Sequence, residues 1–338
     1  MTKRDLAAGI LCYSGMGLLQ CRLERIFSRN HKIIIPAYHR IAEHNAEADY
    51  LDPELISATP EQFENQVKYL AKNYEVITFA QLSEVLEGKR ELKRTPVIIT
   101  LDDGYKDNFD IAWPILKKYG VPATIFITWD YIGQQKLFWW DYIYYLVQNT
   151  KVKNLKLAES GTLAIATNQE KSEAKNKIIA LLKEVKNQHR IKILNKISEI
   201  LNVPEPSDFR ATLNWNEIHQ MAEYGIEFGG HTLSHPILTE LTDEDLQREI
   251  GKSKELLEGA LKTEPVSFCY PVGQGHAVDR RIVAAVRQAG FKFATTACHG
   301  VNNLPSCDFL SLYRLRVSPQ DNQIVFQERI HFPQVITY

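Results

Sequence analysis

The sequence predicts an α/β protein built on a parallel sheet or a (β/α) barrel. Segments typical of buried strands alternate with segments typical of amphipathic helices over most of the chain. Polar residues that can carry chemistry follow several predicted strands directly, as in barrels and open sheets, whose active sites lie at the carboxyl ends of the strands. A chain of 338 residues can bury such a core, as one barrel-sized domain or two ordinary domains.

Residues 96–101 form the clearest predicted strand. After the proline come β-branched residues and a leucine with no charge, which is typical of a strand buried on both faces. The segment ends at Asp102 and Asp103, followed by Gly104 and Tyr105. Two adjacent carboxylates at this place are costly unless a positive charge lies near, which indicates a metal ion. An ordinary Asp-Asp-Gly turn is the alternative interpretation.

A second polar group follows the apolar segment 226–228 and two glycines. Here His231 and His235 form a His-x-x-x-His pattern, which alone is a weak signal. Two neutral imidazoles and a carboxylate are a common zinc-ligand set that leaves a position for water. In combination with the Asp-Asp strand end, the pattern predicts one metal site made by two strand ends.

The other elements follow in order along the chain. Thr59, Pro60 and Gln62 predict a capped helix start, and Phe63, Val67 and Leu70 form its inward stripe. Further helices are predicted at residues 79–86, about 109–119, 171–201 (as one or two helices), 242–261 and 279–289. Further strands are predicted at residues 32–39, 74–78, 121–128, 266–270 and 291–295. Residues from about 135 to 212 interrupt the alternation and predict a mainly helical insertion.

Composition excludes some classes of protein. The chain is 44% apolar and 24% charged, as in soluble globular proteins. Its 40 basic and 41 acidic residues nearly cancel, so no nucleic-acid partner is expected. The five cysteines are odd in number and scattered, which predicts reduced thiols.

Residues 1–30 predict an N-terminal helical segment that packs on the domain or rests peripherally on a membrane surface. Its apolar part, residues 6–19, is too short to span a bilayer. It lacks an Ala-x-Ala-like cleavage site and charged residues follow at once, which argues against a cleaved signal peptide. We therefore expect a cytoplasmic protein, or one peripheral to the inner face of the membrane.

Three motifs resemble those of the polysaccharide deacetylases, the NodB-like carbohydrate esterases of family 4. Residues 100–105 resemble the first motif, residues 231–235 the second and residues 268–273 the third. The resemblance covers roughly residues 33–317 without the insertion. It implies a distorted (β/α) barrel with fewer than eight complete units over residues 31–338. It also implies a hydrolase that removes acetyl groups from an N-acetylated amino-sugar polysaccharide, oligosaccharide or glycolipid.

The resemblance also implies roles for individual residues. Asp103, His231 and His235 would hold one divalent metal ion, Zn²⁺ with Co²⁺ or Ni²⁺ as alternatives. Asp102 would be the general base, and the backbone N–H of Tyr105 would help to hold the developing oxyanion.

The sequence departs from the commoner family pattern in two places. The segment 312–317 has no histidine where most relatives carry the general acid. In a circularly permuted branch, which includes the poly-N-acetylglucosamine deacetylases, the acid lies in a Tyr-His-x-Ile pattern before the first motif, and His39 matches it. Cys269 stands where many relatives have an arginine that pairs with the base, and Arg314 is the candidate replacement. We expect Cys269 to be a buried thiol.

Four further residues are predicted to bind substrate. Tyr270 and Pro271 match the third motif and are expected to line the pocket. Trp139 and Trp140, in the insertion, could stack on pyranose rings; the insertion's own core is the alternative use of these rings. The expected partner is an N-acetylated saccharide, and no oligomeric state is predicted.

Two other functions stay open at this point. The same metal site could open cyclic amides or imides, or the chain could be a catalytically silent carbohydrate-binding protein. The complete set of His39, Asp102, Asp103, His231 and His235 argues against the silent protein.

Overall fold

The chain forms two compact units. The computed structural model describes residues 32–43, 50–207, 209–304 and 306–332. The first unit comprises Met1–Glu43, Ile56–Ile132 and Thr212–Tyr338, and the second comprises His44–Leu55 and Gly133–Ala211. The predicted N-terminal segment, residues 1–30, lies outside the described residues. Among the helices that are described, none has the length and apolar character needed to cross a membrane.

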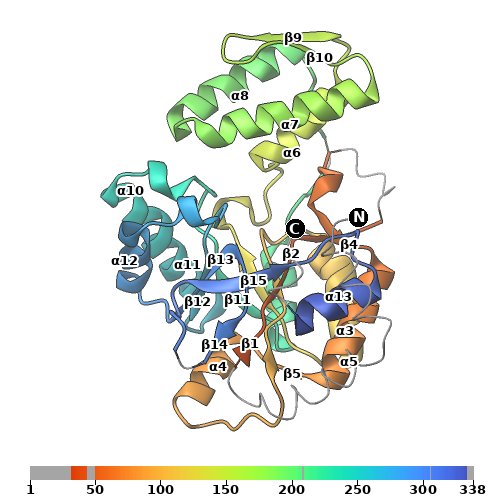
Figure 1. Cartoon of the computed structure of the whole chain (residues 1–338). Helices are drawn as coiled ribbons and strands as arrows, with labels where there is room; N and C mark the ends of the chain where they lie inside the picture. The colour runs from red at the N-terminus through yellow and green to blue at the C-terminus, as the bar shows by residue number, and fades with distance from the viewer. Residues whose placement is uncertain (1–31, 44–49, 208, 305, 333–338) are drawn as a thin grey trace. The chain divides into compact units, whose positions relative to one another are not determined.

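A closed parallel barrel forms the core of the first unit (Figure 1). In the described part of the chain it has seven strands, which confirms the predicted distorted barrel with fewer than eight units. Around the barrel the strands are β11 (Glu227–Gly230), β12 (Ser267–Cys269), β13 (Phe293–His299), β15 (Leu312–Arg316), β2 (Pro36–Tyr38), β7 (Thr100–Leu101) and β8 (Thr124–Ile127). Because all neighbours are parallel, every carboxyl end opens on the same rim.

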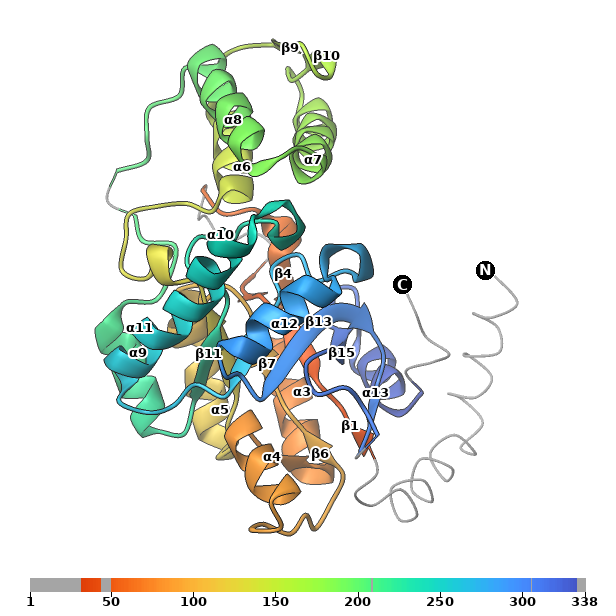
Figure 2. The same cartoon turned by 90° about the vertical axis from the view of Figure 1, so that its left-hand side faces the viewer.

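Helices surround these strands (Figure 2). They are α3 (Pro60–Asn73), α4 (Phe79–Leu86), α5 (Trp113–Tyr119), α9 (Trp215–Glu223), α10 (Asp243–Gln247), α11 (Ser253–Leu261), α12 (Arg280–Gln288) and α13 (Gln323–His331). Two π-helical turns, η2 (Asn108–Ala112) and η5 (Arg248–Lys252), interrupt or begin helices, and the 3₁₀ turns are η3 (Trp129–Tyr131), η4 (Leu238–Glu240) and η6 (Gly275–Ala277). Short strands pair outside the barrel: β1 (Lys32–Ile33) with β14 (Asn302–Asn303), β3 (Arg40–Ile41) with β4 (Ile56–Ala58), and β5 (Glu75–Val76) with β6 (Pro96–Val97).

The helix start predicted at Pro60 is confirmed. The Thr59 hydroxyl accepts a hydrogen bond from the Gln62 N–H at 3.2 Å, and the Gln62 side chain accepts one from the Thr59 N–H at 2.9 Å. This reciprocal pair satisfies two backbone donors that a helix start leaves unpaired. The predicted inward stripe of α3 is fully buried in the main core of the unit.

Some predicted elements are divided in the structure. The strand expected at residues 96–101 changes partner halfway: β6 pairs with β5 outside the barrel, whereas β7 pairs with β2 and β8 inside it. The helices expected at 109–119 and 242–261 contain the π turns η2 and η5. A π turn adds one residue to a helical turn and leaves the apolar periodicity largely intact, so hydrophobic spacing did not reveal it. The helices α9 and α13 were not predicted.

The second unit is mainly helical and has its own core. It contains α6 (Trp139–Asn149), α7 (Asn168–Glu184), α8 (Asn187–Leu201), the antiparallel pair β9 (Asn154–Leu157) and β10 (Gly161–Ala164), and η1 (Pro53–Leu55). The two helices α7 and α8 account for the charged amphipathic stretch at 171–201. The Lys175 ammonium lies 2.9 Å from the buried Asp52 carboxylate, and the Asp141 carboxylate accepts a hydrogen bond from the Asp52 N–H at 2.8 Å. These contacts join the two chain segments of the unit.

Candidate active site

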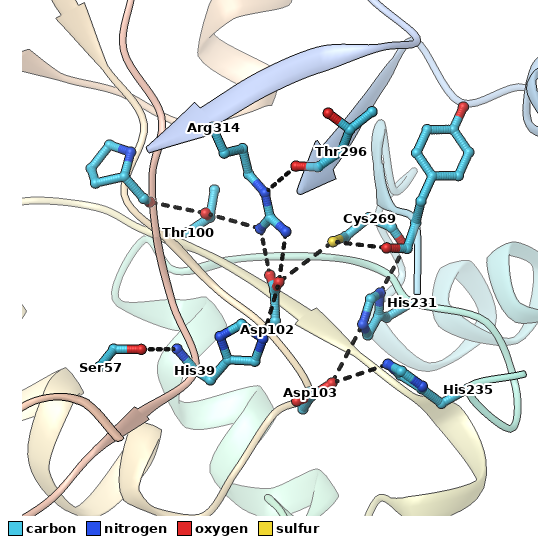
Figure 3. A network of polar contacts seen from close by, with 12 residues as sticks. His39, Ser57, Thr100, Asp102, Asp103, His231, His235, Cys269, Thr296 and Arg314 are labelled. Atoms are coloured by element: carbon cyan, nitrogen blue, oxygen red, sulfur yellow. Dashed lines mark hydrogen bonds and ion pairs between the residues drawn. The ribbon is translucent and has the colours of Figure 1, made fainter. Parts of the chain in front are cut away.

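Polar side chains from five barrel strands converge at the carboxyl rim (Figure 3). All but Arg314 follow or end a strand, so the parallel order of the barrel brings together residues far apart in sequence. The residues are His39 after β2, Asp102 and Asp103 after β7, His231 and His235 after β11, Cys269 at the end of β12, and Arg314 in β15.

Asp103, His231 and His235 form a buried group whose ligand atoms all lie within 4.8 Å of one another. The Nε2 atoms of His231 and His235 lie 3.4 Å and 3.6 Å from Asp103 Oδ1. That oxygen is buried, and no hydrogen-bond partner for it occurs among the described residues. Ligand atoms about 2 Å from a tetrahedral zinc ion stand roughly 3.3 Å apart, so this set fits a divalent ion such as Zn²⁺.

The His231 ring is oriented by the backbone of β12. Its Nδ1 lies 2.7 Å from the Cys269 carbonyl oxygen. A carbonyl only accepts, so Nδ1 carries a hydrogen, and Nε2, which faces Asp103, is the nitrogen that remains to bind a cation. The glycine before this histidine is required by close packing, because a Cβ on Gly230 would lie 2.9 Å from the Phe291 ring.

The metal-ligand segments adopt unusual backbone conformations. Asp103, Thr232 and His235 have φ angles of 71°, 67° and 56°, in the left-handed region that residues other than glycine rarely occupy. Such strain persists only where surrounding contacts enforce it, and it concentrates at functional sites. At the histidine loop, the Thr232 hydroxyl accepts a hydrogen bond from the His235 N–H at 3.0 Å.

Glu249, in the π turn η5, holds the same loop through its side-chain carboxylate. Its Oε2 accepts hydrogen bonds from the N–H groups of Leu233 and Ser234, both at 2.9 Å. Its Oε1 accepts one from the Ser234 hydroxyl at 2.8 Å. The carboxylate is almost fully buried, so these charge-assisted bonds fix the segment between the two histidines.

Asp102 points toward a different partner from Asp103. The two terminal nitrogens of the Arg314 guanidinium donate hydrogen bonds to its carboxylate, Nη1 to Oδ1 at 2.7 Å and Nη2 to Oδ2 at 2.8 Å. Arg314 Nε also donates to the Thr296 carbonyl at 2.8 Å, which fixes the guanidinium plane. Burial alone would raise the pKa of Asp102, but the Arg314 charge outweighs it and holds that pKa well below its usual range. Asp102 is therefore ionised at neutral pH.

His39 lies beside this ion pair at the rim. Its Nε2 is 3.8 Å from Asp102 Oδ2, and 30% of its side chain is exposed. Burial lowers the pKa of His39 below its ordinary value, more strongly than the Asp102 and Asp103 charges raise it. The geometry places an imidazole where it can reach a group bound over Asp102 and Asp103.

Cys269 is a buried free thiol. Its Sγ lies 3.6 Å from Asp102 Oδ2, next to the position that Arg314 occupies from β15. The described cysteines Cys298 and Cys307 are also free. Because the Cys269 carbonyl oxygen accepts a hydrogen bond from His231 Nδ1, this residue also supports the site through its backbone.

Tyr105, Tyr270 and Pro271 are buried at the same end of the barrel. Tyr105 lies under the Arg40 guanidinium, 5.7 Å from the ring centroid, and its predicted oxyanion contact stays a prediction. The Tyr270 ring packs in a core cluster with Phe268, and its hydroxyl donates to the Leu310 carbonyl at 2.8 Å. Successive strand residues point to opposite faces, so this ring faces away from the Cys269 thiol. Substrate contact by Tyr270 and Pro271 stays a prediction, and the Tyr270 ring has a packing role.

Trp139 and Trp140 lie in the second unit. Trp140 stacks on Phe138 at a centroid distance of 4.7 Å, and the Arg190 guanidinium lies 5.4 Å from the Trp139 ring. Both rings therefore have partners within the insertion, as in the core interpretation. Their predicted contact with a sugar stays a prediction.

Sequence reasoning missed the buried polar residues that support the site: Ser57, Thr100, Asn108, Glu249 and Thr296. The sequence contains a signal for two of these residues, Asn108 and Glu249. Asn108 precedes Ala112 and Leu116, and Glu249 follows Leu246, at spacings that place both on the inward stripe of a helix. A polar residue on such a stripe indicates a buried partner.

Comparison with family models identifies a family for this chain. The model described as "Polysaccharide deacetylase" matches residues 89–294. The candidate polysaccharide deacetylase YxkH of Bacillus subtilis (strain 168) is 24% identical over 289 residues, which cover 85% of this chain and 72% of YxkH. The poly-beta-1,6-N-acetyl-D-glucosamine N-deacetylase of Staphylococcus aureus (strain MSSA476) is 33% identical over 107 residues, 29% of this chain and 36% of that protein.

Solved structures show the same fold. The deacetylase PplD of Streptococcus pyogenes, in complex with acetate, matches with a TM-score of 0.59 and 19% identity, covering 88% of this chain and 98% of PplD. IcaB from Ammonifex degensii matches with a TM-score of 0.56 and 16% identity, covering 90% of this chain and 98% of IcaB.

Proposed function

Because the chain belongs to the polysaccharide deacetylase family, we propose that it hydrolyses N-acetyl groups of an amino-sugar saccharide in a metal-dependent reaction. One observation carries this proposal: a carboxylate with two histidines, an arginine-bound carboxylate and a third histidine share one rim of the barrel. The names of the poly-N-acetylglucosamine deacetylases that share sequence with this chain support an N-acetylated substrate. A saccharide polymer or oligomer is the substrate class we propose.

Asp103, His231 and His235 would hold the ion. A divalent cation, Zn²⁺ in our proposal, supplies Lewis-acid polarisation of an amide carbonyl and lowers the pKa of nearby water. The carboxylate and the two imidazole nitrogens suit this ion. The hydrogen bond from His231 Nδ1 to the Cys269 carbonyl keeps that imidazole in the tautomer that can bind a cation.

Asp102 acts as the general base. Arg314 keeps it ionised and holds both its oxygens, so the carboxylate is fixed before substrate arrives. It accepts a proton from the attacking water as the water oxygen bonds to the acetyl carbon. The arginine thus makes Asp102 a weaker base, because it lowers the pKa of the carboxyl group. In return, it fixes the position of the carboxylate and keeps it ionised.

His39 acts as the general acid. As the bond between the acetyl carbon and the nitrogen breaks, the imidazolium form of His39 gives its proton to the leaving amine. Acetate and the free amino sugar leave, and exchange with solvent returns Asp102 and His39 to their starting states. General acid–base catalysis of this kind is worth roughly two to four decades in rate.

The test is acetate release from N-acetylglucosamine oligomers by the purified chain. We expect release with added Zn²⁺, loss of release with a chelator, and recovery when the metal is restored. Matched reactions contain a cyclic amide in place of the saccharide. Hydrolysis of the cyclic amide alone would contradict the proposed substrate, and saccharide hydrolysis that persists in the chelator would contradict the proposed metal dependence.

A further inference from the structure

The backbone of His39 is held on both sides by side chains from other elements. The Ser57 hydroxyl oxygen accepts a hydrogen bond from the His39 N–H at 3.0 Å (Figure 3). The Asn108 side-chain amide donates one to the His39 carbonyl at 3.0 Å. Ser57 is 5% exposed and Asn108 is fully buried, so water does not compete strongly for either bond.

The His39 ring, by contrast, has no such support from the residues that the structure describes. Its nearest charged neighbour is Asp102 Oδ2 at 3.8 Å, which is longer than a hydrogen bond. The position of the imidazole therefore depends on where the His39 backbone is held. A displacement of about 1 Å at a catalytic group can cost roughly a hundredfold in rate.

Ser57 reaches His39 because the pairing of β3 with β4 is irregular. Arg40 pairs with Ile56 and Ile41 pairs with Ala58, so Ser57 is the extra residue of a bulge. Bulges redirect side chains and occur often beside active sites. Here the hydroxyl takes the place of a strand partner for the His39 N–H, in the gap between β2 and β3.

Asn108 reaches His39 from the π turn η2, which follows the segment that carries Asp102 and Asp103. Its amide also donates to Asp107 Oδ1 at 3.0 Å. Asp107 in turn accepts from the Ile41 N–H at 3.3 Å and from Arg40 Nε at 3.0 Å. The same buried cluster thus fixes the segment after β2 to the segment after β7.

We propose that Asn108 and Ser57 are positioning residues that set the distance between the His39 imidazole and the leaving nitrogen. This inference rests on the proposed function of His39 as the general acid. Neither residue touches the reacting atoms, since each acts on the His39 backbone. Their loss is expected to impair the step that needs proton donation and to spare the steps that do not.

The experiment compares two substrates in four variants. The amide substrate is an N-acetylglucosamine oligomer, and the ester is 4-nitrophenyl acetate, whose leaving group departs without a proton. For Asn108→Ala and Ser57→Ala we expect amide kcat to fall about ten- to a hundredfold, part of the usual worth of a general acid, with ester kcat within about threefold of wild type. Ser57→Thr keeps a hydroxyl and should recover most of the amide activity. Ser267→Ala is the matched control.

The control removes a hydroxyl of the same kind elsewhere. Ser267 is a fully buried strand residue whose hydroxyl donates to Glu227 at 2.9 Å, at the amino end of β12. Its loss should leave the ratio of amide to ester activity unchanged. Bound metal and melting temperature, measured for every variant, separate misfolding from mispositioning.

A double-mutant cycle gives the decisive readout. If Asn108 acts through His39, Asn108→Ala has no further effect on amide kcat in a His39→Ala background. An equal further loss in that background, or equal losses on amide and ester, would overturn the positioning role alone. Failure of the wild-type chain to release any acetate would instead overturn the proposed function and the positioning role with it.

Discussion

The two sides of the site hold their histidines in different ways. The metal side of the site consists of Asp103, His231 and His235. There, the His231 ring is bound at Nδ1 by a carbonyl, and His235 lies in a strained loop that Glu249 holds through three hydrogen bonds. The proton-transfer side consists of Asp102 and His39. There, the contacts that hold His39 reach its backbone, and 30% of its side chain is exposed.

This difference matches the two tasks. A metal ligand must present one nitrogen in one direction throughout the reaction, so contacts on the ring itself are useful. A general acid must approach the leaving nitrogen as the bond breaks, so a fixed backbone with a ring that can turn is better suited. In both cases the supporting residue, Glu249 or Asn108, comes from a π turn.

The largest effect is expected when metal ligands are removed. In a His231→Ala, His235→Ala double variant, two of three proposed ligands are gone, so bound metal should fall to background. Acetate release should fall by more than about four decades, since metal assistance and the general acid–base pair act as a unit. Elemental analysis of the purified protein and an acetate assay check this. Full metal occupancy in the double variant would contradict the assignment.

The next effect belongs to the proton-transfer side. Asp102→Asn is nearly isosteric but cannot accept a proton, so we expect metal content to be retained and turnover to fall by roughly two to four decades. The measurement is kcat on the oligomer together with metal content. Turnover within about threefold of wild type would mean that Asp102 is not the general base and that the roles of the two aspartates are misread.

A smaller effect sharpens the comparison on the metal side. Glu249→Gln keeps the size of the side chain but loses the charge that binds the histidine loop. Metal affinity should weaken about ten- to a hundredfold, as for other residues that orient metal ligands, with kcat at saturating metal within about threefold. Metal titration measures this, with the exposed Glu255→Gln as the control. An unchanged dissociation constant would show that the loop holds its shape without this carboxylate.

The last effect concerns stability on the His39 side, and no change in catalysis is needed to detect it. Burial raises the pKa of Asp107 to about 6, against the opposing effect of Arg40. The folded state therefore binds this proton more tightly than the unfolded chain does. The stabilising contribution is full below about pH 4 and is lost as the pH rises through 6, by about 3 kcal/mol in total.

Asp107→Asn removes this titration. The difference in unfolding free energy between wild type and the variant should change by up to about 3 kcal/mol between pH 4 and 7, measured by urea unfolding. The expected sign is that the wild type loses stability relative to the variant as the pH rises. Parallel pH profiles for the two proteins would contradict the prediction.

Sequence reasoning found the residues at strand ends because an abrupt change from apolar to polar residues is a local signal. Asp102 and His231 follow directly on short strands and Asp103 comes one residue later, so the barrel order alone brings them together. The pairing of Arg314 with Asp102 joins residues 212 positions apart, and no local pattern specifies such a contact. Arg314 was a candidate for it only through the family resemblance, and the two hydrogen bonds to Asp102 confirm the pairing. The roles of Asn108 and Glu249 depend on π turns, which hydrophobic spacing does not distinguish from ordinary helix.

The second unit also bears on how this protein is synthesised and how it can be engineered. Its two pieces, His44–Leu55 and Gly133–Ala211, are separated by a stretch of barrel, so the first piece leaves the ribosome before its partners exist. Deletion of the longer piece would remove Lys175, the ion-pair partner of Asp52, and would expose a carboxylate that is buried in the intact unit. A graft of this unit into another barrel would therefore have to exchange both pieces together.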